Sequence, residues 1–277
     1  MPFTLSHPAA VIPLARRPLL VSALVAGSVA PDVPYFVPLA GDSADSLRGR
    51  LDINLTLTHD PASAWWIDTV LAVLLLVAFH VLLKRPLAAL LPVAAAGRVR
   101  SAAAGFRWGG RNLVWIPVSV LLGVATHLVW DSFTHGDGFF VEHVPLMRTP
   151  LAGSLDVARA LQHLSTLGGA AVLAGWLARW WRRTRPEPVE PGTVLAPRPR
   201  YAVLTLMTLA GATGAVVNAV RGAGDGATLE SLAVAAAVGA VAGLGLSLAL
   251  YAVGWQLHRP FARRRAAAPA PAGVASP

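Results

Sequence analysis

Long apolar blocks alternate with short basic segments along most of this chain. Five blocks are long enough to cross a bilayer, since a spanning helix needs about 17–25 residues. These blocks cover residues 66–83, 113–133, 161–181, 201–220 and 231–255. A sixth block, 19–39, is interrupted by Pro31, Pro34 and Pro38, so we expect its regular helix to end near Ala30. The pattern predicts an all-α, polytopic transmembrane helical bundle of about six spans.

Basic residues are concentrated in every second segment between the predicted spans, which puts them on one side of the membrane. Of the 23 Lys and Arg residues, 18 lie before span one, between spans two and three, at or after the end of span four, or after span six. The positive-inside rule assigns these segments, and so both termini, to the cytoplasm. We expect a multi-pass protein of the bacterial cytoplasmic (inner) membrane. Ser28-Val29-Ala30 also resembles a signal-peptide cleavage site, but Pro31 after it disfavours cleavage and favours a retained helix.

Composition supports the membrane assignment and narrows the chemistry. The 277 residues are 55% hydrophobic and 13% charged, about half the charge of soluble domains. A net charge of +9 would suggest nucleic acid in a soluble chain, but no base-reading motif accompanies it. The expected partners are therefore membrane lipids and not nucleic acid. Because the chain has no cysteine, any metal must be held by His and carboxylate.

The polar residues divide the chain into regions of different character. Nearly all of the His and Asp residues fall in residues 1–182, which predicts a membrane-embedded site domain. We expect a cytoplasmic Pro/Arg linker over 183–200, a C-terminal transmembrane hairpin over 201–258 and a disordered tail over 259–277.

The densest group of candidate ligands is Thr126-His-Leu-Val-Trp-Asp-Ser-Phe-Thr-His135. His127, Asp131 and His135 are spaced i, i+4, i+8, which puts all three on one face of a helix. Such a stripe can offer two or three ligands to one divalent ion. The alternative is a structural seam of hydrogen bonds between helices.

Four further candidates carry similar chemistry. Asp32 follows Pro31 at the end of the first apolar block and is a candidate ligand or base, or only a helix cap. His59 precedes span two, where Asp60 could act merely as an N-cap. His163 lies at the start of span four, a position that is often structural. His7 lies near the N-terminus and would reach the others only if residues 2–15 re-enter the bilayer.

The predicted topology brings these positions to one face of the membrane. Asp32, His59, Asp131, His135 and His163 all fall at extracytoplasmic ends of spans or in the loops beside them, although histidines were not used to assign that face. We therefore expect the side chains to meet near the headgroup level. Glu142 and His143 are candidates for an outer layer of the site, whereas His80 and His258 are expected at the opposite, cytoplasmic interface.

Several motifs together resemble a known family. They are Met-Pro-Phe-Thr-Leu-Ser-His-Pro at the start, Val-Ala-Pro-Asp-Val-Pro-Tyr-Phe, Leu-Thr-His, Thr-His-Leu-Val-Trp-Asp-Ser-Phe-Thr-His-Gly-Asp-Gly and Leu-Gln-His-Leu-Ser-Thr. Over about residues 1–182 the chain resembles DUF4184, an uncharacterised family of bacterial membrane proteins. The ordered His, Pro-Asp, Thr-His and His-x3-Asp motifs are also distantly similar to inner-membrane metal-dependent hydrolases of the YdjM/DUF457 type.

The second resemblance implies a ligand set and an activity. It implies that His7, Asp32, His59, His127 and Asp131 hold a divalent metal. The sequence departs from that pattern at Leu-Thr-Leu-Thr-His-Asp, where relatives carry an Arg-containing His-Ser motif, and at Val-Pro-Tyr, where they have a further acidic residue.

These observations lead to one preferred function and one alternative. The preferred function is a metal-dependent membrane hydrolase that uses zinc on a lipid-like or envelope ester or phosphoester. Asp32, His135 and His163 are its candidate catalytic groups, as general base, ligand or orienting residue. The alternative is a non-enzymatic membrane protein or proton-coupled transporter that uses the same His/Asp cluster.

Overall fold

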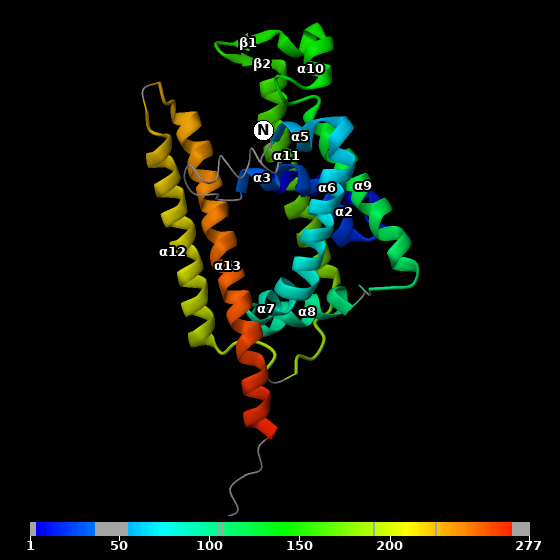
Figure 1. The fold of residues 1–277 in the computed structure, drawn as a ribbon, viewed down its shortest axis with the longest axis vertical. Helices are drawn as coiled ribbons and strands as arrows, with labels where there is room; N and C mark the ends of the chain where they lie inside the picture. Colours follow the sequence, from blue (N-terminus) through cyan, green and yellow to red (C-terminus); the bar gives the residue numbers. More distant parts are fainter. Residues whose placement is uncertain are drawn as a thin grey trace, which may run out of the picture. The chain divides into compact units, whose positions relative to one another are not determined.

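The structure, a computed structural model, describes residues 4–36, 55–104, 106, 108–190, 192–224 and 226–267. Within these residues it is helical apart from one short β-hairpin (Figure 1). The chain divides into two compact units, Met1–Ala78 with Val93–Glu190, and Phe79–Pro92 with Pro191–Pro277. The boundary at residue 190 falls inside the predicted linker, but the inserted segment 79–92, which joins the C-terminal unit, was not anticipated.

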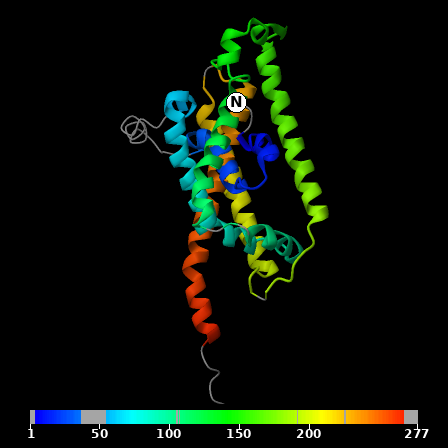
Figure 2. The same ribbon diagram turned by 90° about the vertical axis from the view of Figure 1, so that its right-hand side faces the viewer.

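The first unit holds every predicted site residue that the structure describes. Its elements are η1 (Thr4–Ser6), α1 (Pro8–Val11), η2 (Ile12–Leu14), α2 (Val21–Val29), η3 (Ala30–Asp32), α3 (Val33–Phe36), α5 (Leu55–His59), α6 (Pro61–Val77), α8 (Val93–Ala104), α9 (Arg111–Asp131), α10 (Phe139–His143), η5 (Pro145–Arg148), β1 (Pro150–Ala152), β2 (Leu155–Asp156) and α11 (Val157–Arg183). The strands β1 and β2 pair antiparallel beyond α10. The long, straight α11 is clearest in the turned view (Figure 2).

A close helix crossing forms the centre of the first unit. A Cβ atom on Gly27 of α2 would lie 2.2 Å from the carbonyl oxygen of Val120, and one on Gly123 of α9 would lie 2.3 Å from that of Leu24. Both glycines are therefore needed for the two backbones to touch. The apolar core beside the crossing combines α2, α6 and α9, with Ala26, Leu76 and Val120 among its buried members.

A sharp break separates α5 from α6. The Asp60 side chain accepts a hydrogen bond from the Ala62 backbone N–H at 3.3 Å, and Pro61 occupies the first helical position. This is a favourable N-cap, so the capping role considered for Asp60 is confirmed. Because the chain turns here, His59 is left as the last residue of α5, at the mouth of the site described below.

The helix α9 begins after two glycines with positive φ, Gly109 and Gly110, and ends at Asp131. The chain then turns, and the His135 N–H donates back to the Asp131 carbonyl oxygen at 2.9 Å. Of the three residues predicted to share one helix face, only His127 and Asp131 therefore lie on the helix. His135 lies on the turn after the helix rather than on the helix itself.

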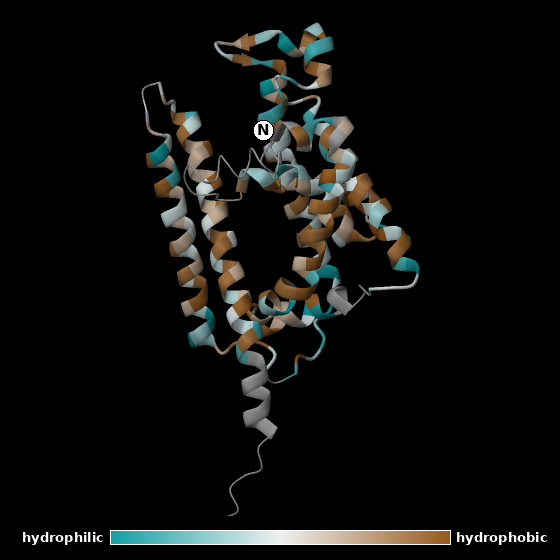
Figure 3. Ribbon diagram, in the orientation of Figure 1, coloured by the Kyte–Doolittle hydropathy of each residue, from teal (hydrophilic) through white to brown (hydrophobic). Residues whose placement is uncertain are grey.

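The second unit contains a two-helix hairpin of α12 (Pro197–Gly222) and α13 (Leu229–Ala267). It also contains α7 (Lys84–Ala89) and most of a π-helical stretch, η4 (Ala78–Leu83), whose first residue, Ala78, belongs to the first unit. Gly214 and Gly239 face each other so closely that a Cβ atom on either would lie 2.1 Å from the other's carbonyl oxygen. Asn218 also donates to the Ala235 carbonyl oxygen at 2.8 Å. Apolar residues run along both helices (Figure 3).

Four helices are long and apolar enough to cross a membrane. They are Ala64–Ala89, Arg111–Asp131, Pro197–Gly222 and Leu229–His258, and they correspond to four of the six predicted spans. The helix over the sixth block, α2, has nine residues, which at 1.5 Å per residue extends only about 14 Å. It ends at Val29, next to the expected position, while residues 37–39 of that block lie outside the described residues.

The predicted span 161–181 forms part of α11, whose 27 residues are long enough to cross but which is not among the four apolar helices. Within the described residues, the structure thus supports a helical membrane protein with four candidate spans, and the count of six stays a prediction. At the other end of the chain, α13 continues to Ala267, into the segment predicted to be a disordered tail. Residues 268–277 of that tail lie outside the described residues.

Candidate metal centre

Four side chains from separate elements of the first unit converge on one point. They are Asp32 from η3, His59 from α5, and His127 and Asp131 from α9. One ligand atom from each lies within 4.8 Å of the other three. Residues almost 100 positions apart are therefore brought into one cluster, which could hold a metal ion. In Figure 1 the elements α2, α5 and α9 lie together at this place.

The spacing of the ligand atoms fits a four-coordinate ion. The Nε2 atom of His127 lies 3.1 Å from Asp131 Oδ2, 3.7 Å from Asp32 Oδ1 and 3.4 Å from His59 Nε2. The Nε2 atom of His59 lies 3.5 Å from Asp131 Oδ2 and 3.6 Å from Asp32 Oδ1. Ligands at about 2.0 Å from a tetrahedral ion are about 3.3 Å apart, which matches these separations closely.

Each imidazole of the cluster is held in place by a contact to Nδ1, the ring nitrogen that points away from the other ligand atoms. His127 Nδ1 lies 2.8 Å from the carbonyl oxygen of Ser28, to which it donates, and His59 Nδ1 lies 3.2 Å from the Thr58 hydroxyl. Partners of this kind fix the tautomer and orientation of metal-binding histidines. Both rings therefore present Nε2 to the same point. The Ser28 carbonyl is close enough because Gly27 and Gly123 bring α2 against α9.

The two carboxylates give the cluster a strong need for positive charge. Asp32 is fully buried and Asp131 is 4% exposed, and none of their four oxygen atoms has a hydrogen-bond partner within the described part of the chain. Burying an uncompensated carboxylate costs several kcal/mol. Two carboxylates and two neutral imidazoles would balance the charge of one divalent cation. The donor set and its charge thus fit such an ion.

His7 reaches the centre from the N-terminal segment. Its ring is 1% exposed and stacks on the ring of His127, with centroids 3.9 Å apart. Its Nε2 lies 3.5 Å from the second oxygen of Asp131, Oδ1. Burial, aided by repulsion from His127, lowers the pKa of His7 to about 4, so this ring is neutral. It lies outside the four-atom group, and a direct bond from His7 to a metal stays a prediction.

His135 and His59 form the accessible side of the centre. Their side chains are 21% and 23% exposed, whereas that of His127 is fully buried. His135 Nδ1 lies 3.4 Å from Asp131 Oδ2. Burial alone would lower the pKa of His59, but its contacts with Asp131 and Asp32 outweigh burial and raise the pKa to about 10. Between the bare carboxylates His59 therefore carries a proton.

Other predicted residues are not gathered here. His163 is exposed on α11, on a different side of that helix from Leu161 and Ser165, which face α9. His143 is exposed and directs Nδ1 to the carbonyl oxygen of Phe139 at 2.8 Å. No contact links either of them to the four ligand residues within the described residues, and the roles considered for both stay predictions.

Two supporting residues of the centre and one buried carboxylate outside it were missed by the sequence patterns. Ser28 acts through a main-chain oxygen and Thr58 through a hydroxyl, and neither residue type stands out in a loop or apolar block. Asp68 of α6 is fully buried, and neither of its carboxylate oxygens has a hydrogen-bond partner in the described residues. It could have been noticed as the one carboxylate inside the span predicted over 66–83.

The fold and the site together define a helical membrane protein with a buried His/Asp group able to hold a metal ion. The sequence matches the family described as "Domain of unknown function (DUF4184)" over residues 1–253. The chain therefore belongs to the DUF4184 family, and the match extends beyond the resemblance noted at 1–182 into α13. No curated protein and no solved structure matches the chain.

Proposed function

We propose that this protein is a metal-dependent membrane hydrolase that acts on a lipid-like or envelope ester or phosphoester at the extracytoplasmic face of the bacterial inner membrane. The observation that carries the proposal is the convergence of Asp32, His59, His127 and Asp131, whose ligand atoms lie within 4.8 Å of one another. A structural seam would join its polar atoms by hydrogen bonds of regular geometry. Here the imidazole nitrogens lie 3.1–3.7 Å from the two carboxylates, but none of the four carboxylate oxygens makes such a hydrogen bond in the described residues.

The donor set favours zinc. Two imidazole nitrogens and two carboxylate oxygens at tetrahedral spacing suit Zn²⁺, whereas Mg²⁺ and Ca²⁺ prefer six or more oxygen ligands. A zinc ion bound here would supply Lewis-acid chemistry, polarising an ester or phosphoester group and lowering the pKa of a water molecule.

The chain's own residues divide the remaining work. His127 is buried and held by the Ser28 carbonyl, so its role is to bind and orient. His135 lies at the accessible side, with its Nδ1 at 3.4 Å from Asp131 Oδ2. We assign it the movement of a proton to or from the reacting group. The stacked His7 excludes water from the buried side.

The membrane orientation rests on charge. The positive-inside rule places the basic segments before α9 and after α11 in the cytoplasm, which requires α11, 27 residues long, to cross the membrane in addition to the four apolar helices. The Asp131 end of α9 then faces the extracytoplasmic side, where the 136–153 segment follows it. A substrate could then approach His59 and His135 from the headgroup region. This places the reacting group of a lipid, rather than its tail, next to the centre.

One observation favours a second candidate, a proton-coupled transporter that uses the same cluster. Asp68 is a buried carboxylate inside the candidate span Ala64–Ala89, and ionisable groups at membrane depth often relay protons. Asp68 could continue a proton path from the centre along α6.

Metal analysis of the purified protein tests the first step. We expect about one zinc ion per wild-type chain, and at least tenfold less in His127→Ala and Asp131→Ala, because each variant removes a ligand. His258→Ala, an exposed histidine of the second unit, is the matched control and should retain the metal. Equal, near-zero zinc in the wild type and the ligand variants would contradict the metal site.

Turnover separates the two candidates once metal is bound. We expect the zinc-loaded protein to hydrolyse p-nitrophenyl acetate or bis(p-nitrophenyl) phosphate, to lose this activity with a chelator and to regain it with Zn²⁺. A protein that binds zinc but hydrolyses neither probe would contradict the hydrolase. Proton flux into vesicles containing that protein would then support the transporter.

A further inference from the structure

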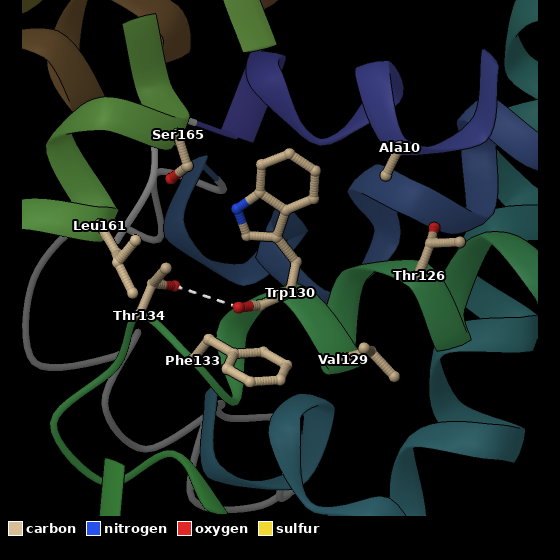
Figure 4. Close-up of a pocket in the computed structure, with 8 residues that line it drawn as sticks. All are labelled: Ala10, Thr126, Val129, Trp130, Phe133, Thr134, Leu161 and Ser165. Atoms are coloured by element: carbon tan, nitrogen blue, oxygen red, sulfur yellow. Dashed lines mark hydrogen bonds between the residues drawn. The ribbon is translucent and has the colours of Figure 1, made fainter. Parts of the chain in front are cut away.

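A groove of about 500 Å³ lies beside the metal centre, between α9 and α11 (Figure 4). Its floor is a row of residues on the α9 side, Thr126, Trp130 and Thr134, at spacing i, i+4, i+8. Leu161 and Ser165 of α11 form the opposite wall. The volume is within the range of about 300–1,000 Å³ that ligand sites occupy.

The groove offers a bound molecule almost no polar partner. All three of its hydroxyl groups donate within their own helices or turns, Thr126 to Gly123 at 2.7 Å, Thr134 to Trp130 at 3.4 Å and Ser165 to Gln162 at 2.9 Å. The rest of the lining is aliphatic and aromatic. A polar or charged occupant would lose hydration without replacement, so the occupant is apolar.

The groove and the metal centre share a wall. The Trp130 ring meets the His7 ring edge-on at a centroid distance of 6.1 Å, and His7 in turn stacks on His127 at 3.9 Å. The ligand pair His127 and Asp131 follows the groove row by one residue, a rotation of about 100° around the helix. The same two turns of α9 therefore carry metal ligands on one stripe and an apolar channel on the next.

The position of the groove indicates what kind of apolar molecule meets it. It lies at the Asp131 end of α9, a helix apolar enough to cross a membrane, where such a helix leaves the hydrocarbon. The helical part of the row, from residue 126 to residue 130, extends about 6 Å along that axis, in the direction of the lipid tails. Lipid tails are also the apolar groups present at the highest concentration there.

We propose that this groove binds one acyl chain of a glycerolipid, with the ester or phosphoester head of the same molecule at the Asp32–His59–His127–Asp131 centre. The inference rests on the proposed function and names its substrate class. The metal ligands select the charged or ester-bearing head, and the groove selects a long unbranched tail. Each methylene buried in the groove should raise affinity about fourfold until the groove is filled.

Photo-labelling tests the groove without requiring turnover. The full chain is reconstituted in phosphatidylglycerol vesicles that contain a small fraction of phosphatidylglycerol with a diazirine on one acyl chain. After irradiation, we expect peptides that include residues 126–134 and 161–165 to be labelled several-fold above peptides from the lipid-facing surfaces of α12 and α13. Labelling that is uniform over all apolar helices, or absent from the groove because a second copy of the chain covers it, would overturn the proposal.

A matched pair of variants makes the labelling specific. Ser165→Trp fills the groove, whereas Leu164→Trp adds the same bulk one residue away, on a side chain that is 66% exposed. We expect Ser165→Trp to reduce groove labelling at least fivefold and Leu164→Trp to leave it within twofold of the wild type. Similar labelling of both variants would overturn the proposal, and thermal unfolding identifies a variant that is misfolded.

Chain-length dependence separates this inference from the proposed function. With zinc bound, the ratio of p-nitrophenyl decanoate to p-nitrophenyl acetate hydrolysis should fall at least tenfold in Ser165→Trp and stay within twofold of the wild-type ratio in Leu164→Trp. Equal loss on both esters would overturn the acyl site while leaving the hydrolase intact. Groove labelling in a protein that cleaves neither ester would instead refute the hydrolase and retain the lipid site.

Discussion

His127 illustrates how one residue can serve both the fold and the site. Its Nδ1 is bound to a carbonyl of α2, while its Nε2 faces three other ligand atoms. The sequence predicted the pairing of His127 with Asp131, because i, i+4 spacing on a helix requires it. It could not predict which nitrogen faces the ion, since that depends on a main-chain oxygen 99 residues away.

The stability of the metal-free protein should depend on pH in a way set by two histidines. His7 has a pKa lowered to about 4, so between pH 4 and 6.5 the unfolded chain binds a proton that the folded chain does not, and stability rises with pH. His59 has a pKa raised to about 10, so its contribution is complete below pH 6.5 and is lost between pH 6.5 and 10. We expect the thermal midpoint in detergent with chelator to be greatest near pH 6.5.

Two comparisons check that His59 causes the loss of stability on the alkaline side of the pH profile. His59→Gln should flatten the alkaline side of the profile, because the residue that holds the extra proton is gone. Saturating zinc should flatten it as well, because the ion replaces that proton. An unchanged alkaline limb in His59→Gln would show that another group is responsible.

Asp68 is a residue whose burial costs stability without visible compensation in the described residues. We expect Asp68→Asn to have a thermal midpoint, measured with chelator, no lower than that of the wild type, because it removes a buried charge that has no hydrogen-bond partner. Asp131→Asn, which loses contacts to several histidines, should lower the midpoint. A comparable fall in both variants would mean that Asp68 is a structural group.

At the scale of elements, short helical segments supply as many ligand residues to the centre as the long helices do. The ligands His59 and Asp32 come from α5 and η3, of five and three residues, which were predicted only as the ends of spans. Proline and aspartate at 60–61 and 31–32 do signal chain breaks, and those breaks occur where expected. The direction in which the chain leaves each break depends on tertiary packing, so the meeting of these ends was inferred from topology alone.

The α2–α9 crossing should control metal binding from outside the centre. Gly123→Ala would put a methyl group 2.3 Å from the Leu24 carbonyl oxygen, which forces the helices apart. We expect a loss of about 1–3 kcal/mol in stability, as for other overpacked sites, and weaker zinc binding because the Ser28 carbonyl withdraws from His127. Thermal unfolding and metal content measure the two effects.

The control for this crossing is Gly175→Ala on α11. A Cβ atom there would meet nothing within 4 Å in the described structure, so both stability and zinc content should equal those of the wild type. Retention of full zinc binding in Gly123→Ala would separate the crossing from the centre and contradict the argument.

At the scale of the whole molecule, hydrophobic patterning predicted the helical fold correctly, and four of the six predicted spans correspond to long apolar helices in the described residues. In the block at 19–39 the helix α2 ends at Val29, before Pro31 and Pro34, and the block at 161–181 lies within the 27-residue α11, which carries Arg159 and Arg179 near its ends. Hydrophobic patterning locates long apolar segments, but it does not show where a proline or the fold ends the helix within them.

The orientation of the chain can be tested because it contains no cysteine. Gly136→Cys lies in the turn after α9, with open space around the new side chain, and we expect a membrane-impermeant maleimide to label it from outside intact cells. Arg185→Cys, exposed after α11, should be labelled only after permeabilisation. Labelling in the reverse order would place the metal centre on the cytoplasmic side.

The hydrogen bond from His127 to the main chain of Ser28 has a consequence for which substitutions this family can accept at that position. An anchor made by a carbonyl oxygen is indifferent to the side chain attached to it, and the position is limited only by the lack of room, since Ser28 is completely buried. Alanine or glycine could stand there in other members without loosening the histidine. A position that orients a metal-binding histidine could therefore vary among related sequences, while the strictest limit on residue type would fall on Gly27 and Gly123.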